Sequence, residues 1–253
     1  MACAATCSRS SSVPRPEILL MLSLSLTRSI DDPLNVLCLG AHCDDIEIGC
    51  GGTLLTLLSQ HPNVNVYWQV FSSTPSRETE ATAGAKHFCA TARNLEVSIL
   101  NFRDGYLPYE GSAIKDAFEQ TKQRFKPDVV FTHYRNDLHQ DHRVISELTW
   151  NTFRNHLILE YEIPKWDGDF GTPNAFVTIE QAVADKKIAA LQAIYNSQNN
   201  KSWFTDDVFQ SILRLRGMES NSRTKLAEAF YARKVAIDIG NSLRQIDRLA
   251  GAK

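Results

Sequence analysis

The stretch "NVLCLGAHCDDIEIGCGGTLLTLLSQ" (residues 35–60) decides the fold class. It opens on a short apolar run, residues 35–40, of the kind that a buried parallel strand shows. It closes on residues 51–60, whose leucines cover a broad apolar face of a helix. Between the two lies a polar loop that contains His42, Asp44 and Asp45. A strand that leads through a short loop into a helix is the first part of a β-α-β unit.

The same alternation continues beyond this stretch. β-rich segments at 64–71, 96–100 and 128–133 alternate with helical patterns at 77–92, 112–125 and 140–156. After residue 156 the pattern loosens into short strands, an amphipathic helix over 180–198 and a further helix over about 205–216. This rhythm predicts an α/β fold, with a Rossmann-like, doubly wound and mainly parallel sheet between two helical layers in a three-layer α/β/α arrangement.

Length and composition set further limits. The 253 residues are 43% hydrophobic, which suits one sizeable domain, and we place it at residues 34–253. A net charge of -2 gives no general attraction to nucleic acid or anionic membranes. We find no stretch long enough to span a bilayer. The six cysteines form no C-x-x-C pair, so we interpret them as reduced thiols and expect a cytoplasmic protein.

Residues 1–33 are predicted to be an N-terminal extension. They are rich in Ser and Ala, and a short apolar run covers residues 18–26. We interpret the segment as a disordered extension. A targeting segment over residues 1–30 is the alternative that composition leaves open.

Polar side chains follow two of the predicted strands. The first cluster, His42, Asp44 and Asp45, comes directly after the first strand. The second follows the fourth strand in "THYRNDLHQDHR" (132–143) and contains His133, Asp137, His139, Asp141 and His142. In open α/β sheets ligands bind beyond the carboxyl ends of the strands, where both loops open onto one rim. We therefore expect the two clusters to converge, although about ninety residues separate them.

Convergence would assemble a metal site. A catalytic zinc ion takes three protein ligands and keeps one position for water, and His42, Asp45 and His142 would supply an N, O, N set. A water bound there becomes acidic enough to act as a nucleophile near neutral pH. Asp44 would then serve as the general base. The alternative for Asp44 or Asp45 alone is a cap on the following helix.

Two further residues of the second cluster suit the same chemistry. His139 precedes His142 by one helical turn and would stabilise an oxyanion or protonate a leaving amine. Asp141 would orient His139, as a carboxylate next to a functional histidine commonly does.

Several motifs resemble those of the LmbE-like, or PIG-L, family of zinc-dependent N-deacetylases. "AHCDDIEIGCGG" (41–52) is similar to that family's A/G-H-P-D-D-x-x-x-x-x-G-G motif, and "HQDHR" (139–143) to its H-P/x-D-H-R motif. The resemblance extends from residue 35 to residue 237 and includes "SRETEATAGA" (76–85), "RDGYL" (103–107), "ADKKIAALQAIYNSQ" (184–198) and "LAEAF" (226–230).

The resemblance implies a zinc-dependent hydrolase that removes an acyl group, usually acetyl, from a glucosamine unit by means of a metal-activated water. It implies one Zn²⁺ per chain, with other divalent metals as alternatives, and an N-acetylated amino sugar or its conjugate as the partner. A homo-oligomer is allowed, because relatives often form one. The implied roles are zinc ligation by His42, Asp45 and His142, catalysis by Asp44, His139 and Asp141, and sugar binding by Arg77 and Asp104.

The chain departs from the family pattern at Cys43, where the family usually has proline. Losing the proline frees the backbone φ angle and restores an N–H donor. A thiol beside a zinc ligand could compete for the metal. Cys43 could instead pack as a small apolar residue, and on that interpretation we expect activity to be retained.

Three rival functions fit the sequence less well. A metal-dependent phosphoesterase with two metal ions needs more bridging carboxylates than these loops supply. A nucleotide-binding module is disfavoured because "GCGG" (49–52) lacks the G-x-G-x-x-G spacing and the His/Asp cluster would repel a pyrophosphate. A non-catalytic sugar-binding relative would be expected to lack Asp44 or His139. Trp166 is either a platform for a sugar ring or a structural tryptophan.

Overall fold

The computed structural model of the chain describes residue 24 and residues 32–237. Its strands and helices alternate from the start, as the sequence predicts. In chain order they are β1 (Leu34–Gly40), α1 (Asp45–Gln60), β2 (Val64–Ser72), α2 (Pro75–Phe88), β3 (Asn94–Phe102), η1 (Leu107–Glu110), α3 (Gly111–Arg124), β4 (Val129–His133), α4 (Gln140–Thr152), β5 (Leu157–Tyr161), β6 (Ala175–Thr178), α5 (Gln181–Ile194), η2 (Asn196–Gln198), α6 (Asp206–Glu219) and β7 (Ala227–Ala232).

The strands form one seven-stranded sheet in the order β3-β2-β1-β4-β5-β7-β6. The pairs from β3 through β5 are all parallel, whereas β7 runs antiparallel to both β5 and β6. The predicted α/β fold with a mainly parallel sheet is therefore confirmed. The antiparallel strands belong to the region after residue 156, where the periodicity of the sequence loosens.

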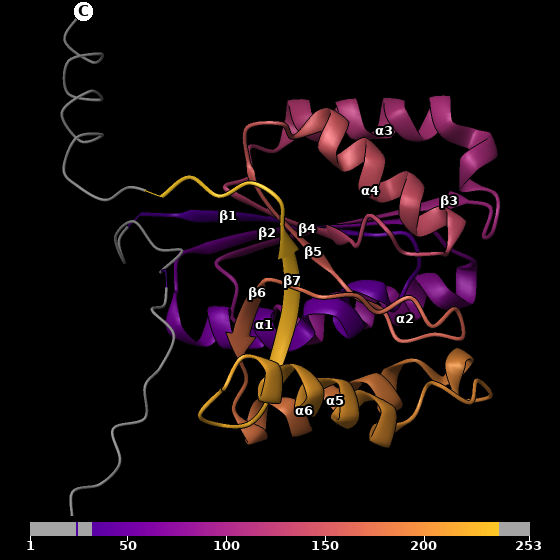
Figure 1. Cartoon of the computed structure of the whole chain (residues 1–253). Coiled ribbons are helices and arrows are strands. Elements are labelled where there is room, and N and C mark those ends of the chain that lie inside the picture. Colours follow the sequence, from indigo (N-terminus) through magenta and orange to yellow (C-terminus); the bar gives the residue numbers. More distant parts are fainter. Residues whose placement is uncertain (1–23, 25–31, 238–253) are drawn as a thin grey trace, which may run out of the picture.

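Helices lie on both faces of the sheet (Figure 1). α3 and α4 cover one face and α1 and α2 lie on the other, while α5 packs against α1 and α2, and α6 packs against α5 and β7. Strand β1 shows why its sequence is a continuous apolar run. Val36 and Cys38 belong to the core on the α1 side, Leu37 and Leu39 belong to the core on the α3 side, and all four are fully buried.

Several helix boundaries differ from the predicted ones, and α2, predicted over 77–92, ends at Phe88. α1 begins at Asp45 rather than at residue 51, so the glycine-rich segment is helical and not part of the loop. Acidic Asp45 and Glu47 in its first turn suit the positive end of a helix dipole. α4 ends at Thr152 rather than at residue 156.

The sheet reverses its winding between β1 and β4. From β1 the chain winds outward to β2 and β3, and β4 then begins on the other side of β1 and leads to β5. The loops after β1 and β4 consequently flank one crevice, which is where ligands bind in such sheets. The topology therefore brings the two predicted polar clusters together.

Some predictions fall on residues that the structure does not describe. Most of the N-terminal extension, residues 1–33, and the last part of the predicted domain, residues 238–253, lie outside the described residues. The domain limits stay predictions. Within residues 32–237 no helix combines the length and the apolar character that crossing a membrane requires.

Candidate metal centre

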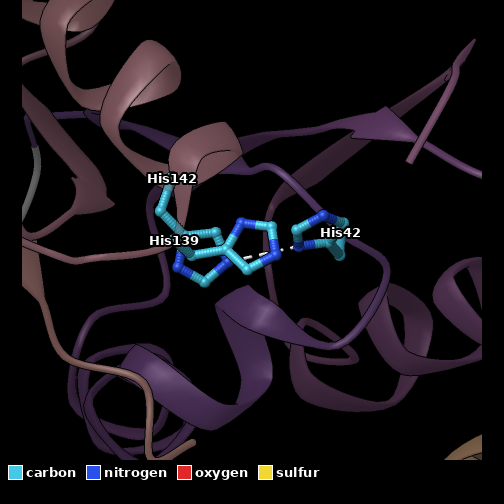
Figure 2. Close-up of side chains that lie close together, drawn as sticks. All are labelled: His42, His139 and His142. Carbon is cyan, nitrogen blue, oxygen red and sulfur yellow. Dashed lines mark hydrogen bonds between the residues drawn. The ribbon is translucent and has the colours of Figure 1, made fainter. Parts of the chain in front are cut away.

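Three predicted ligands meet where the loop after β1 faces the start of α4. His42 Nδ1 lies 3.2 Å from His142 Nε2, as the dashed line in Figure 2 marks. Asp45 Oδ2 lies 3.4 Å from His42 Nδ1, and Asp45 Oδ1 lies 3.6 Å from His142 Nε2. Ligand atoms about 2.0–2.1 Å from a tetrahedral zinc ion are separated by roughly 3.3 Å. The spacing of these donor atoms therefore fits a single bound metal ion.

Other donors surround these three. Figure 2 shows the rings of His42, His139 and His142 gathered on one side of α1. The donors form three overlapping groups, and within each group the ligand atoms lie within 4.8 Å of one another. The groups are His42 with His139 and His142, Asp45 with His133 and His142, and His42 with Asp104 and Asp141. The three predicted ligands all belong to the first two groups. The described residues thus offer more N and O donors than one ion needs.

His142 is oriented by a carboxylate to which the sequence analysis assigned no role. Its Nδ1 lies 2.9 Å from Asp137 Oδ2, and Lys165 Nζ donates to the same oxygen at 3.0 Å. We assign the ring proton to Nδ1, which leaves the lone pair of Nε2 directed at the cluster. Burial and the neighbouring His133 lower the pKa of His142 to about 3, so the ring is neutral. A neutral imidazole held by a carboxylate is the usual form of a histidine metal ligand.

His133 is the second residue of the cluster that lacked a predicted role. It is fully buried at the end of β4, and its ring stacks on that of His142 with centroids 3.9 Å apart. Its Nε2 accepts the N–H of Ala41 at 2.9 Å and lies 3.2 Å from Asp45 Oδ2. Its Nδ1 is buried without a hydrogen-bond partner. Its position as the last residue of a buried strand is the sequence signal that could have identified it.

Carboxylates also surround the other edge of His42. Its Nε2 lies 3.2 Å from Asp104 Oδ1 and 3.3 Å from Asp141 Oδ2. Burial alone would lower the pKa of His42, but Asp45, Asp104 and Asp141 raise it well above its usual range. The excess of acidic groups makes the centre attractive to a cation.

Asp141 lies beside His42 and the turn that follows β3. Its carboxylate accepts the N–H groups of Gly105 at 2.7 Å and Leu107 at 3.2 Å. Asp141 contacts His139 through its backbone: the Asp141 N–H donates to His139 Nδ1 at 3.3 Å. His139 thus occupies the N-cap position of α4. The predicted action of the Asp141 carboxylate on His139 stays a prediction.

Asp44 stands at the N-cap position of α1, yet its side chain makes no capping hydrogen bond. Its Oδ1 instead accepts from Arg77 Nη2 in the first turn of α2, at 3.0 Å. Burial raises the pKa of Asp44 above its usual value, and the charge of Arg77 opposes this effect. The side chain of Asp44 therefore does not cap α1, which was the alternative interpretation of this residue.

Seven of the eight predicted site residues line one cavity, and Asp141 is the exception. Its lining comprises His42, Asp44, Asp45, Arg77, Asp104, His139 and His142, together with Ile163, Lys165, Trp166, Asp167, Lys201 and Trp203. Trp166 is 71% exposed, and its ring meets that of Trp203 edge to face at 6.3 Å. An aromatic surface thus stands at the mouth of a polar site.

Cys43 faces away from this cavity. Its Sγ lies 3.5 Å from both the carbonyl oxygen of Ser72 and the Oγ of Ser73, and the residue belongs to the core on the α1 side. Burial raises the pKa of its thiol to about 11. Among the described residues Cys38, Cys43, Cys50 and Cys89 are all unpaired and buried. These observations favour the interpretation of Cys43 as a packed apolar residue.

Comparisons with known proteins agree with the motifs. Residues 37–153 match the family model described as PIG-L: GlcNAc-PI de-N-acetylase. The uncharacterized deacetylase YaiS of Escherichia coli (strain K12) is 27% identical over 182 residues, which cover 68% of this chain and 96% of YaiS.

Two solved structures share the fold. GalB, the 4-carboxy-2-hydroxymuconate hydratase of Pseudomonas putida KT2440, gives a TM-score of 0.66 at 16% identity and covers 82% of this chain and 99% of its own. The N,N'-diacetylchitobiose deacetylase of Pyrococcus horikoshii gives a TM-score of 0.57 at 21% identity, over 81% of this chain and 86% of its own. A hydratase and a deacetylase share the architecture, so the reaction must be argued from the site.

Proposed function

Since the chain belongs to the PIG-L/LmbE-like deacetylase family, we propose that it is a zinc-dependent N-deacetylase acting on an N-acetylated amino sugar or its conjugate. The observation that supports this most is the spacing of 3.2–3.6 Å among the donor atoms of His42, His142 and Asp45. Asp44 and His139 line the same cavity as these three. Metal ligands, a base and an acid in one cavity are what amide hydrolysis by a metalloenzyme requires.

The metal would be held by His42, Asp45 and His142. Bound Zn²⁺ supplies a Lewis acid that polarises the amide carbonyl and lowers the pKa of water at its open position. Asp137 contributes by fixing the tautomer of His142. The N and O donor set suits zinc better than the harder cations that prefer oxygen alone.

Asp44 is proposed as the general base. Its carboxylate takes the proton from the water as the oxygen attacks the acetyl carbon. Arg77, 3.0 Å from Asp44 Oδ1, holds that carboxylate at the cavity wall. Burial raises the pKa of Asp44, and the positive charge of Arg77 opposes this effect.

His139 is proposed as the acid. Because its Nδ1 accepts the N–H of Asp141, the ring proton lies on Nε2. The Nε2–H of the neutral ring stabilises the developing oxyanion, and only the protonated, imidazolium form of His139 passes a proton to the amine when the C–N bond breaks. The products are acetate and the free amino sugar.

The sugar is proposed to bind between the polar wall and the aromatic rim. Asp104 is 61% exposed at its side chain and can accept hydrogen bonds from sugar hydroxyls. Trp166 offers an exposed ring at the cavity mouth, against which the apolar face of a sugar can pack. Arg77 lies 3.9 Å from Asp104 and can reach the same ligand.

A deacetylation screen tests the proposal. The full chain is incubated with zinc and with free N-acetylglucosamine, its oligomers or N-acetylglucosamine conjugates, and released acetate and amine are measured. A generic phosphodiester assay in parallel distinguishes a metal-dependent phosphoesterase. The proposal predicts acetate from at least one amino sugar and no phosphodiester cleavage. Phosphodiester cleavage without deacetylation would contradict it.

A further inference from the structure

Helix α1 is broken just after the turn that starts at Asp45. Cys50, inside the helix, has φ -141° and ψ 15°, which are not helical values. The segment before the break carries Asp45 and follows Asp44, so it belongs to the candidate metal centre. The segment after it continues to Gln60. A break of this kind has an identifiable cause, and here two buried side chains insert into the helix.

The two side chains come from the C-terminal part of the chain, beyond the matched residues 37–153. Glu228 of β7 accepts the N–H groups of Gly52 at 2.8 Å and Thr53 at 2.6 Å. Lys187 of α5 donates to the carbonyl oxygen of Ile48 at 2.6 Å and to Glu228 Oε1 at 2.6 Å. The Lys187 and Glu228 side chains are each 3% exposed.

This pattern is specific to the backbone groups at the break. In a continuous α-helix the N–H of Gly52 would donate to the carbonyl oxygen of Ile48. Here Glu228 receives the N–H and Lys187 supplies a donor to the carbonyl. The ion pair therefore replaces the helical hydrogen bond between the Gly52 N–H and the Ile48 carbonyl oxygen, because Glu228 bonds to the first and Lys187 to the second. A buried charge pair is costly unless such additional hydrogen bonds are made.

The glycines around the break pack closely against neighbouring side chains. A Cβ atom on Gly52 would lie 2.9 Å from Glu228 Oε1, and one on Gly49 would lie 2.2 Å from the ring of Tyr161. Tyr161 in turn donates to the carbonyl oxygen of Leu39 at 2.6 Å, in the strand that ends at the metal-binding loop. The glycines of the motif thus let the break pack against β5 and β7.

We propose that the Lys187–Glu228 pair positions the metal-binding turn of α1. By keeping the helix broken at Cys50, the pair sets the direction of the turn that begins at Asp45. That direction brings the Asp45 carboxylate to His142 across the crevice, at 3.6 Å. The inference rests on the proposed metal centre and assigns Lys187 and Glu228 as positioning residues, remote from the substrate.

The double variant K187M/E228L tests this assignment. Apolar residues of similar volume in place of a buried ion pair often leave stability unchanged, so the fold should survive. With the pair removed, the Gly52 N–H and the Ile48 carbonyl can bond to each other, and α1 becomes continuous. We expect zinc affinity, measured by competition with a chromophoric chelator, to fall by roughly tenfold or more. The Co²⁺ absorption spectrum should change with it, while the thermal unfolding midpoint stays close to that of the wild type.

The matched control is R216M/E162L. Arg216 and Glu162 form another buried pair, 2.8 Å apart, in which α6 contacts the segment after β5. This variant loses a buried pair without touching α1, so its zinc affinity should equal that of the wild type. Equal losses in both double variants would indicate general loosening and overturn the proposal.

Other outcomes separate the positioning role from the proposed function. Wild-type zinc affinity in folded K187M/E228L overturns the positioning role and leaves the deacetylase proposal standing. If the wild type binds zinc but releases no acetate, the deacetylase proposal is overturned. The positioning role is then still decided by comparing the zinc affinity of K187M/E228L with that of the wild type and of R216M/E162L. A wild type that binds no zinc overturns both. If K187M/E228L does not fold, E228Q, which keeps the volume and one acceptor oxygen, is judged by the same criteria.

Discussion

Arg77 Nη2 lies 3.0 Å from Asp44 Oδ1, so the arginine expected to bind sugar hydroxyls holds the carboxylate expected to act as the base. The contact joins the first turn of α2 to the residue that precedes α1. Burial raises the pKa of Asp44, and Arg77 is the main positive charge that opposes this effect. The pair therefore links the proposed base to α2 and offsets part of the effect of burial.

This pairing makes a prediction for R77M. If Arg77 positions Asp44, kcat should fall by about tenfold or more, because the base loses its fixed place. A residue that only binds substrate would raise KM and leave kcat unchanged. Steady-state kinetics on the best amino-sugar substrate measures the split. R124M, which removes an exposed arginine paired with Glu96 on the surface, is the control and should change neither constant.

Asp44 and His142 should separate catalysis from metal binding. D44N should retain zinc and lose turnover by roughly a hundredfold, as expected for a missing general base. H142A should lose the metal, because His142 Nε2 is one of the donor atoms. Metal content after dialysis, measured alongside kcat, tests both. Equal zinc loss in the two variants would show that the base and the ligand have been interchanged.

Asp137 should matter through His142. D137N removes the charged acceptor at Nδ1, 2.9 Å away, and should weaken zinc binding by roughly 10- to 100-fold. The exposed Asp116 of α3 provides a control in D116N, whose affinity should not change. Chelator competition gives the affinities. Unchanged zinc binding in D137N would mean that Asp137 does not orient a ligand.

Cys43 should be dispensable for the chemistry. Its Sγ points to Ser72 and Ser73, so C43A should keep its zinc and keep kcat within about twofold, at a cost of about 1 kcal/mol in stability. C89A, another buried cysteine, is the matched control for loss of sulfur. Loss of zinc in C43A but not in C89A would assign the thiol to the metal centre.

The sequence predicted the first part of the fold well because its signals are local. The apolar run at 35–40 is buried on both faces of the sheet, and the strand ends place His42 and His142 at one crevice. The roles of Asp137 and His133 were missed because they depend on ring orientation, which spacing along the chain does not encode. The break at Cys50 escaped prediction for a similar reason: Lys187 and Glu228, which we propose keep the helix broken, lie more than a hundred residues away along the chain.

Zinc-dependent acetate release tests the central claim most directly. The metal-free chain is titrated with Zn²⁺ while acetate release from the best N-acetylated amino sugar is followed, and a chelator is added at the end. The proposed function predicts activity that rises to a plateau near one zinc ion per chain and disappears with the chelator. Acetate release that is independent of zinc, or one bound zinc ion without any acetate release, would contradict it.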